Sequence, residues 1–82
     1  MLTDYIHAAM RHAHYEFLSE DKVFYGEISP LQGVMATGET LEGCREELKS
    51  VLESWIIVSL QFNDPIEDID GISFKPKKLI NA

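Results

Sequence analysis

The hydrophobic residues of this chain change their spacing twice, from a helical repeat to an alternating one and back. Over the first segment they recur three or four positions apart, which predicts an α-helix over about residues 3–13 with Thr3 or Asp4 at its start. From His14 the side chains alternate with a period of two, which is the spacing of β-strands. The predicted strands, about residues 14–20, 23–29 and 34–37, are separated by polar or glycine-containing turns.

A second helical repeat begins after Gly38 and predicts the main helix over about residues 41–62. Thr40 is a candidate N-cap, and Glu42 falls in the first turn, where the helix dipole favours a carboxylate. The turn-forming sequence that ends at Pro65 stops the helix. The apolar stripe of this helix consists of Leu41, Cys44, Leu48, Val51, Leu52, Trp55 and Phe62.

Beyond Pro65, Ile72 and Phe74 alternate around Ser73 and predict a short fourth strand over about residues 72–75. The order of elements predicts an α+β fold for one domain that covers residues 1–82. In this fold a three-stranded antiparallel meander, with the short fourth strand added, carries the long helix on one face. The N-terminal helix is an extra element.

Acidic residues outnumber basic ones, with 14 Asp and Glu, 7 Lys and Arg, and a net charge of −7. Such a chain repels nucleic-acid backbones and favours a basic protein as its partner. Hydrophobic residues make up 45% of the sequence, which is enough to form a folded core. Because a domain of this size buries only roughly 60% of its unfolded surface, we expect a homo-oligomer, a dimer or larger.

The single cysteine, Cys44, indicates a reducing environment, since it cannot form an internal disulfide. The first residues lack the basic and apolar regions of a signal peptide, so we expect a cytoplasmic protein. The longest apolar stretch, about residues 55–60, is too short to cross a bilayer, and no membrane partner is expected.

Few residues have the spacing that a catalytic or metal site requires. The acidic run Asp64, Glu67, Asp68 and Asp70 lacks the spacing of a calcium-binding loop and is interpreted as a solvated loop. His12 and His14 form an H-x-H pair without a third ligand nearby. We therefore expect no metal, no cofactor and no catalytic residues.

The remaining candidates are interpreted as packing or surface residues. Cys44 lies on the apolar stripe, where a thiol behaves as a small buried hydrophobe, and Trp55 is expected to anchor the core. His7 lies on the polar side of the first helix, and Tyr25 belongs either to the core or to an interface. Since no nucleophile stands beside a base, the residues predict a small acidic interaction module and not an enzyme.

A longer pattern spans residues 25–42, with the sequence YGEISPLQGVMATGETLE. It resembles the signature of the HicB family of antitoxins: an aromatic-rich strand, P-x-x-G, a short strand, G-[DE]-T-L-E and a helix. The likeness extends over about residues 14–74. Pro30 and Gly33 are expected to form a turn, Gly38 to adopt an unusual backbone angle, and Thr40 to cap the helix. The signature residues are Pro30, Gly33, Gly38, Thr40, Leu41 and Trp55.

The resemblance implies a partial ribonuclease H-like fold that lacks the catalytic carboxylates of that fold. It also implies a partner, a small basic ribonuclease toxin of the HicA type, whose catalytic surface the antitoxin covers. Family members often carry a C-terminal DNA-binding domain for which this chain leaves no room, so we expect no direct DNA binding. The acids of the sheet region, Glu16, Glu27 and Glu39, are expected to face the toxin.

Two alternatives stay open. One is an interaction module of the same fold that binds a different protein. The other is a metal-dependent nuclease of the ribonuclease H type, which requires carboxylates that converge on a shared metal ion.

Overall fold

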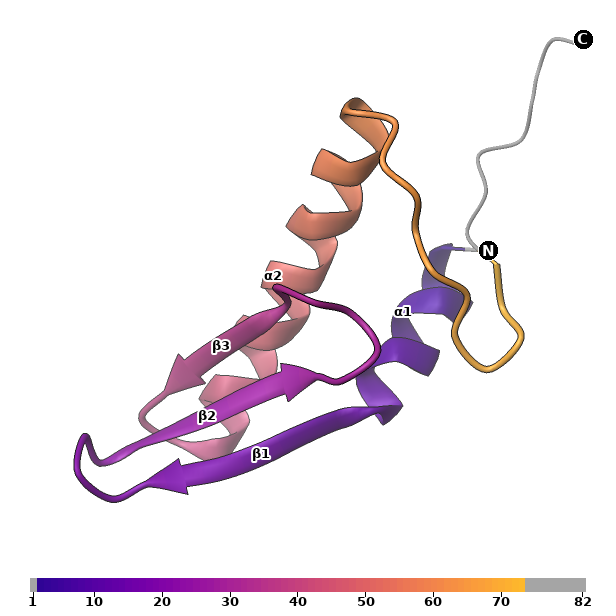
Figure 1. The fold of residues 1–82 in the computed structure, drawn as a ribbon. Helices are drawn as coiled ribbons and strands as arrows, with labels where there is room; N and C mark the ends of the chain where they lie inside the picture. The colour runs from indigo at the N-terminus through magenta and orange to yellow at the C-terminus, as the bar shows by residue number, and fades with distance from the viewer. Residues whose placement is uncertain (1, 74–82) are drawn as a thin grey trace, which may run out of the picture.

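The computed structural model describes residues 2–73 and has the α+β fold that the sequence predicts. Its elements, in chain order, are α1 (Leu2–Arg11), β1 (Ala13–Leu18), β2 (Val23–Ile28), β3 (Met35–Gly38) and α2 (Leu41–Gln61). Figure 1 shows that the strands form one sheet, that α2 crosses one face of it, and that α1 lies beyond the sheet beside α2. Neither of these helices is both long enough and apolar enough to cross a membrane.

The sheet is an antiparallel meander in the order β1-β2-β3. Tyr15 pairs with Gly26, which in turn pairs with Ala36, so one row of residues crosses all three strands. This row lies on the face of the sheet that α2 covers. Because side chains alternate along a strand, the residues just before and after each member of the row lie on the opposite face. The turn between β2 and β3 places Gly33 at a φ of 89°, in the left-handed region that glycine tolerates best.

The start of α2 is fixed by a side-chain cap and by a close approach to the sheet. The Thr40 hydroxyl accepts a hydrogen bond from the backbone N–H of Gly43 at 2.9 Å, which confirms the predicted N-cap. At Gly38 a Cβ atom would lie 2.5 Å from the backbone nitrogen of Cys44. The prediction of an unusual backbone angle at Gly38 is wrong, since the glycines of residues 2–73 with positive φ are Gly33 and Gly71. Gly38 is needed because any side chain there would collide with α2.

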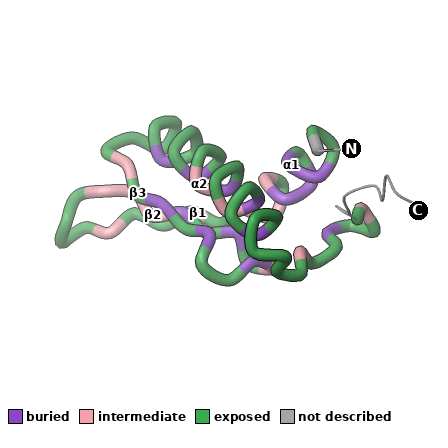
Figure 2. The backbone as a smooth tube through the Cα atoms, turned by 90° about the horizontal axis from the view of Figure 1, so that it is seen from above, coloured by how far each residue is buried: buried purple, intermediate pink, exposed green. Residues whose placement is uncertain are grey.

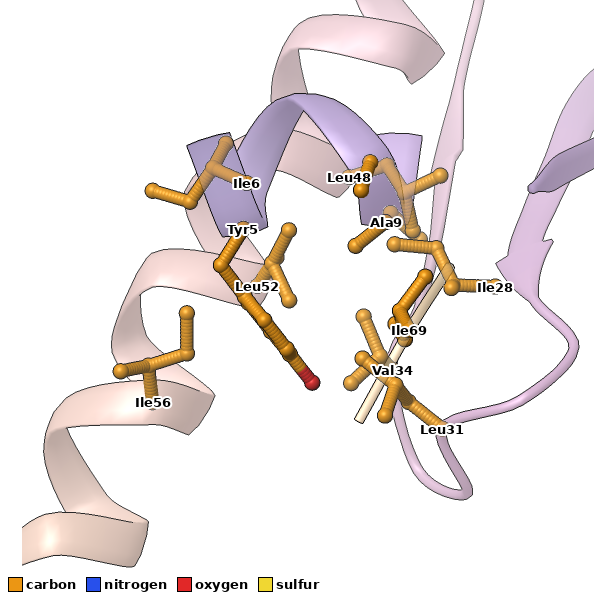
Figure 3. Packing of buried hydrophobic residues seen from close by; sticks show 12 residues of the cluster. Tyr5, Ile6, Ala9, Ile28, Leu31, Val34, Leu48, Leu52, Ile56 and Ile69 are labelled. Atoms are coloured by element: carbon orange, nitrogen blue, oxygen red, sulfur yellow. The ribbon is translucent and has the colours of Figure 1, made fainter. Parts of the chain in front are cut away.

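The core lies where α1, α2 and the turn after β2 meet, as the purple segments of Figure 2 show. Tyr5 reaches between Leu52 and the turn, and Leu48 lies beside Ala9 in Figure 3. The buried cluster consists of Tyr5, Ile6, Ala8, Ala9, Ile28, Leu31, Val34, Ala36, Leu48, Leu52, Ile56 and Ile69. Two residues of the predicted apolar stripe are exposed instead, Leu41 by 48% and Phe62 by 70%, because they lie at the ends of α2, beyond the core.

The chain after α2 turns back and is attached to α1. The Tyr5 hydroxyl donates a hydrogen bond to the backbone oxygen of Glu67 at 2.6 Å. His12, just after α1, places its Nε2 atom 2.7 Å from a carboxylate oxygen of Asp70. Ile69, between these two contacts, is 3% exposed. The N-terminal helix is therefore an integral part of the core.

The predicted fourth strand does not join the sheet over the residues that the structure describes. Asp70 and Gly71 both have positive φ and form a tight turn, so Ile72 pairs back onto Ile69 in an isolated bridge. Residues 74 and 75 of the predicted strand lie outside the described residues. The predicted starts of β2 and α2 match the structure, and the other predicted boundaries differ by one or two residues, since α1 ends at Arg11 and β1 already begins at Ala13.

Candidate interaction site

The face of the sheet opposite α2 is uncovered and carries residues from all three strands. We call these residues the open face: His14, Glu16, Leu18, Val23, Tyr25, Glu27, Met35 and Thr37. They alternate along the strands with residues that lie under α2. Figure 2 shows α2 on one side of the strands, which leaves this side free. It is a broad surface and suits a macromolecule better than a small ligand.

Tyr25 occupies the middle of the open face, on the central strand. Its hydroxyl donates a hydrogen bond to Oε1 of Glu27 at 3.0 Å and lies 3.6 Å from the sulfur of Met35. Glu16 is the direct partner of Tyr25 across the β1–β2 pair. The hydrogen bond to Glu27 raises the pKa of Tyr25, and desolvation and the charges of Glu27 and Glu16 raise it further. Both carboxylates therefore act on this one phenol, and the open face is negatively charged.

The three acids predicted to face a toxin do not all lie together. Glu16 and Glu27 share the open face and are exposed, whereas Glu39 lies in the connection between β3 and α2. Within residues 2–73 neither Glu16 nor Glu27 forms an ion pair. These two carboxylates are therefore available to a basic partner.

Two of the residues interpreted as packing residues have that role. Cys44 is fully buried, its thiol donates to the backbone oxygen of Ala36 at 3.6 Å, and burial raises its pKa. A thiol in this environment stays protonated and unreactive. Trp55 is partly buried and packs against the core. Tyr25 belongs to the open face and not to the core.

The acidic run is more than a solvated loop, because Asp70 holds it against the first helix. Arg11 lies 3.6 Å from one Asp70 oxygen, and His12 lies 2.7 Å from the other. The hydrogen bond from His12 lowers the pKa of Asp70, and the positive charges of His12 and Arg11 lower it further. Asp68 accepts a hydrogen bond from Ser73 at 2.9 Å. No sequence pattern indicates the contact between Asp70 and His12, which are 58 positions apart.

The two histidines of the H-x-H pair have different surroundings. His12 binds Asp70, whereas His14 lies on the open face opposite Glu27. Among residues 2–73, no three His, Cys, Asp or Glu side chains lie close enough together to hold a metal ion.

The fold and the open face define a class of small α+β domains in which one helix backs a three-stranded meander. The chain belongs to the UPF0150-like family, whose model matches residues 4–67. This is a family of small proteins that are similar to HicB-type antitoxins.

One solved structure is similar over almost the whole chain. It is the crystal structure of TTHA0281 from Thermus thermophilus, with 33% sequence identity and a TM-score of 0.86. The alignment covers 93% of this chain and 94% of that one. No curated protein matches the chain.

Proposed function

We propose that this chain is a HicB-like antitoxin that binds and neutralises a small basic ribonuclease toxin of the HicA type. The observation that carries the proposal is the placement of Glu16 and Glu27 beside Tyr25 on the open face. Neither carboxylate has a cationic partner within residues 2–73. The lysines and arginines of a basic toxin provide such partners. Membership of the UPF0150-like family is consistent with a small antitoxin-type module.

For neutralisation of this kind the antitoxin has to cover the catalytic surface of the toxin, and it needs no catalytic activity of its own. A ribonuclease holds its RNA by the phosphates, so carboxylates placed against the same lysines and arginines compete with the substrate. All 14 acids of the chain lie before residue 74, whereas 3 of its 7 Lys and Arg follow that position. The strong negative field accelerates the encounter with a basic protein, and salt weakens that acceleration.

The open face also offers apolar contact area around its charges. Tyr25 and Met35 lie together in its middle, and Met35 is 47% exposed. Aromatic side chains at the centre of an interface contribute a large share of binding energy, while charges around them set the orientation and the association rate. Tyr25 is thus the proposed anchor, with Glu16 and Glu27 steering the toxin onto it.

The test uses the basic ribonuclease encoded by a neighbouring reading frame, purified as a catalytically inactive variant. Glu16→Lys and Glu27→Lys are expected to lower its association rate by about tenfold each at low salt, and by less at high salt. Stopped-flow fluorescence at two ionic strengths measures these rates. Glu39→Lys, outside the sheet, is expected to have a smaller effect than the two variants on the open face.

Glu47→Lys is the matched control, because Glu47 is exposed on α2 and undergoes the same change of charge. Equal rates for the open-face variants and this control would show that only the total charge matters and that the toxin does not dock on the open face. A neighbouring reading frame without a basic ribonuclease, together with a stable complex of another kind, would assign the chain to a different protein partner.

We also propose that a second copy of the chain covers the end of α2. Ile57, Val58, Leu60 and Phe62 are all at least 38% exposed there. Clustered apolar side chains on the surface of a small domain mark an interface. Self-association buries these side chains and adds stability to a domain of 82 residues, which buries a smaller share of its surface than a larger domain does.

A further inference from the structure

A groove about 360 Å³ in volume separates the solvent-facing sides of α1 and α2. His7, Met10 and Arg11 of α1 line one side of it, and Arg45 and Lys49 of α2 line the other. None of these residues belongs to the open face, so the groove is a separate feature of the molecule. Apart from Met10, every side chain that lines it is basic.

The concentration of positive charge in this groove is unusual for so acidic a chain. Residues 2–73 contain four lysines and arginines, and three of them, Arg11, Arg45 and Lys49, line the groove. The fourth, Lys22, lies in the turn between β1 and β2. The same segment contains 14 acids spread over its surface, so the basic residues are gathered at one place.

The basic side chains form two levels across the groove. His7 and Arg11 are four residues apart on α1, and Arg45 and Lys49 are four residues apart on α2. Each pair therefore spans about 6 Å along its helix, slightly more than one turn. The two helices run in opposite directions (Figure 1), and Figure 3 places Tyr5 beside Leu52 and Ala9 beside Leu48. Arg11 therefore lies at the level of Arg45, and His7 lies at the level of Lys49.

Most of these groups are not neutralised by the protein itself. Glu46 and Glu53 line the adjoining hollow along α2, yet neither forms an ion pair with Arg45 or Lys49. Arg11 approaches Asp70 only to 3.6 Å and remains 63% exposed. Among residues 2–73 the groove thus presents two unpaired cations, a third that is partly paired, and a histidine.

We infer that this groove is an anion-binding site that takes a compact phosphate or diphosphate group, either free or carried by a small metabolite. The guanidinium forks of Arg11 and Arg45 match phosphate oxygens in pairs, and Lys49 adds a point charge. The two levels of donors suit an anion with charge on more than one centre. A long nucleic acid does not fit, because the acids outside the groove repel a polyanion.

The test is an isothermal calorimetric titration of the full chain with sodium pyrophosphate, compared with sodium chloride of matched ionic strength. Pyrophosphate is expected to bind. The double variant Arg45→Gln/Lys49→Gln is expected to weaken binding by about tenfold or more, since each charged hydrogen bond that is lost contributes to affinity. Lys22→Gln is the matched control, because it removes the basic residue outside the groove and is expected to leave the affinity within about twofold.

A second measurement needs no variant. Amide chemical shifts of the unaltered chain are expected to move at His7, Met10, Arg11, Arg45 and Lys49 when pyrophosphate is added. An effect no larger than that of sodium chloride, or equal binding by the double variant, would overturn the inference. Tighter binding of an octaglutamate peptide than of pyrophosphate would also overturn it and would assign the groove to an acidic protein segment.

Discussion

The two halves of α2 differ in the side chains that they present to solvent. In residues 41–53, which lie over the sheet, the exposed side chains are mostly charged. They include Glu42, Arg45, Glu46, Glu47, Lys49 and Glu53. Residues 54–61 contain no charged side chain, and Ile57 and Val58 are 57% and 47% exposed there. One helix therefore carries two surfaces of different chemistry.

The sides of the two halves that face the protein interior are alike, so the two halves differ only in the side chains that face solvent. Leu48 and Leu52 are fully buried in the first half, and Ile56 and Ser59 are nearly so in the second. Packing inside this chain thus explains the inner stripe along the whole helix. It does not explain why the outer side of residues 54–61 is apolar, and a surface of that kind is typical of a segment that another chain covers.

The largest expected effect separates the inner stripe from the outer one. Leu48→Ala is expected to lower the free energy of unfolding by about 2–5 kcal/mol, because it leaves a cavity at a fully buried site between α1 and the sheet. Leu60→Ala makes the same chemical change in the same helix at a side chain that is 38% exposed in the single chain. In the monomer it is expected to lower the free energy of unfolding by less than about 1 kcal/mol.

Urea unfolding at a protein concentration low enough to keep the chain monomeric measures both changes, with the mass checked for each variant. Comparable losses for the two leucines would mean that the outer side of residues 54–61 contributes as much to stability as the core, and would remove the distinction between the two stripes.

A smaller effect is expected on self-association. Ile57→Ser/Phe62→Ser is expected to shift the chain toward the monomer. Ile57 and Phe62 are 57% and 70% exposed in the single chain, so each gains on association only part of the roughly 1.5–3 kcal/mol that full burial contributes. Light scattering after size exclusion, over a range of concentrations, measures the mass. Glu46→Ser/Glu53→Ser alters two exposed residues of the charged half and is expected to leave the mass unchanged. A chain that is monomeric at every concentration would contradict the proposed second copy.

Local sequence patterns are sufficient to predict the two helices, the three strands and part of the buried stripe of α2. Thr40 is recognisable as a cap because its hydroxyl acts on a backbone group three residues away, and Cys44 and Leu48 follow from the helical repeat. The same repeat predicts Leu41 and Phe62 to be buried, and both are exposed. Periodicity shows which side of a helix is apolar, but it does not show how far along the helix the rest of the protein packs against that side. As far as residue 73, the predicted fourth strand does not join the sheet, because Asp70 and Gly71 turn the chain back on itself.

The candidate sites depend more on pairing than on pattern. Alternation alone puts Glu16 and Glu27 on strand faces, but only the register of β1 with β2 places both beside Tyr25. Glu39 is close to the strands in sequence and yet lies outside the sheet. The basic groove joins residues about 40 positions apart, and the i, i+4 pairs on either helix are too common to reveal it alone.

The smallest expected effect concerns the segment that returns from the apolar end of α2 to α1. His12 and Arg11 hold the pKa of Asp70 below its ordinary value in the folded chain, so its stabilising contribution is present above the pKa of an unfolded aspartate, about 3.9. It is lost as the pH falls through the lower, folded-state pKa. Asp70→Asn is therefore expected to flatten the fall of the melting temperature below about pH 4.

The matched control for this last effect is Asp64→Asn, at an exposed residue of the same segment whose carboxylate forms no ion pair within residues 2–73. It is expected to keep the slope of the unaltered chain, because it removes a carboxylate from the same segment and leaves the contact of Asp70 with His12 and Arg11 intact. Equal slopes for the unaltered chain, Asp70→Asn and Asp64→Asn would mean that the contact with His12 and Arg11 does not hold the returning segment. In that case the hydrogen bond from Tyr5 of α1 to Glu67 and the burial of Ile69 alone hold this segment against the rest of the fold.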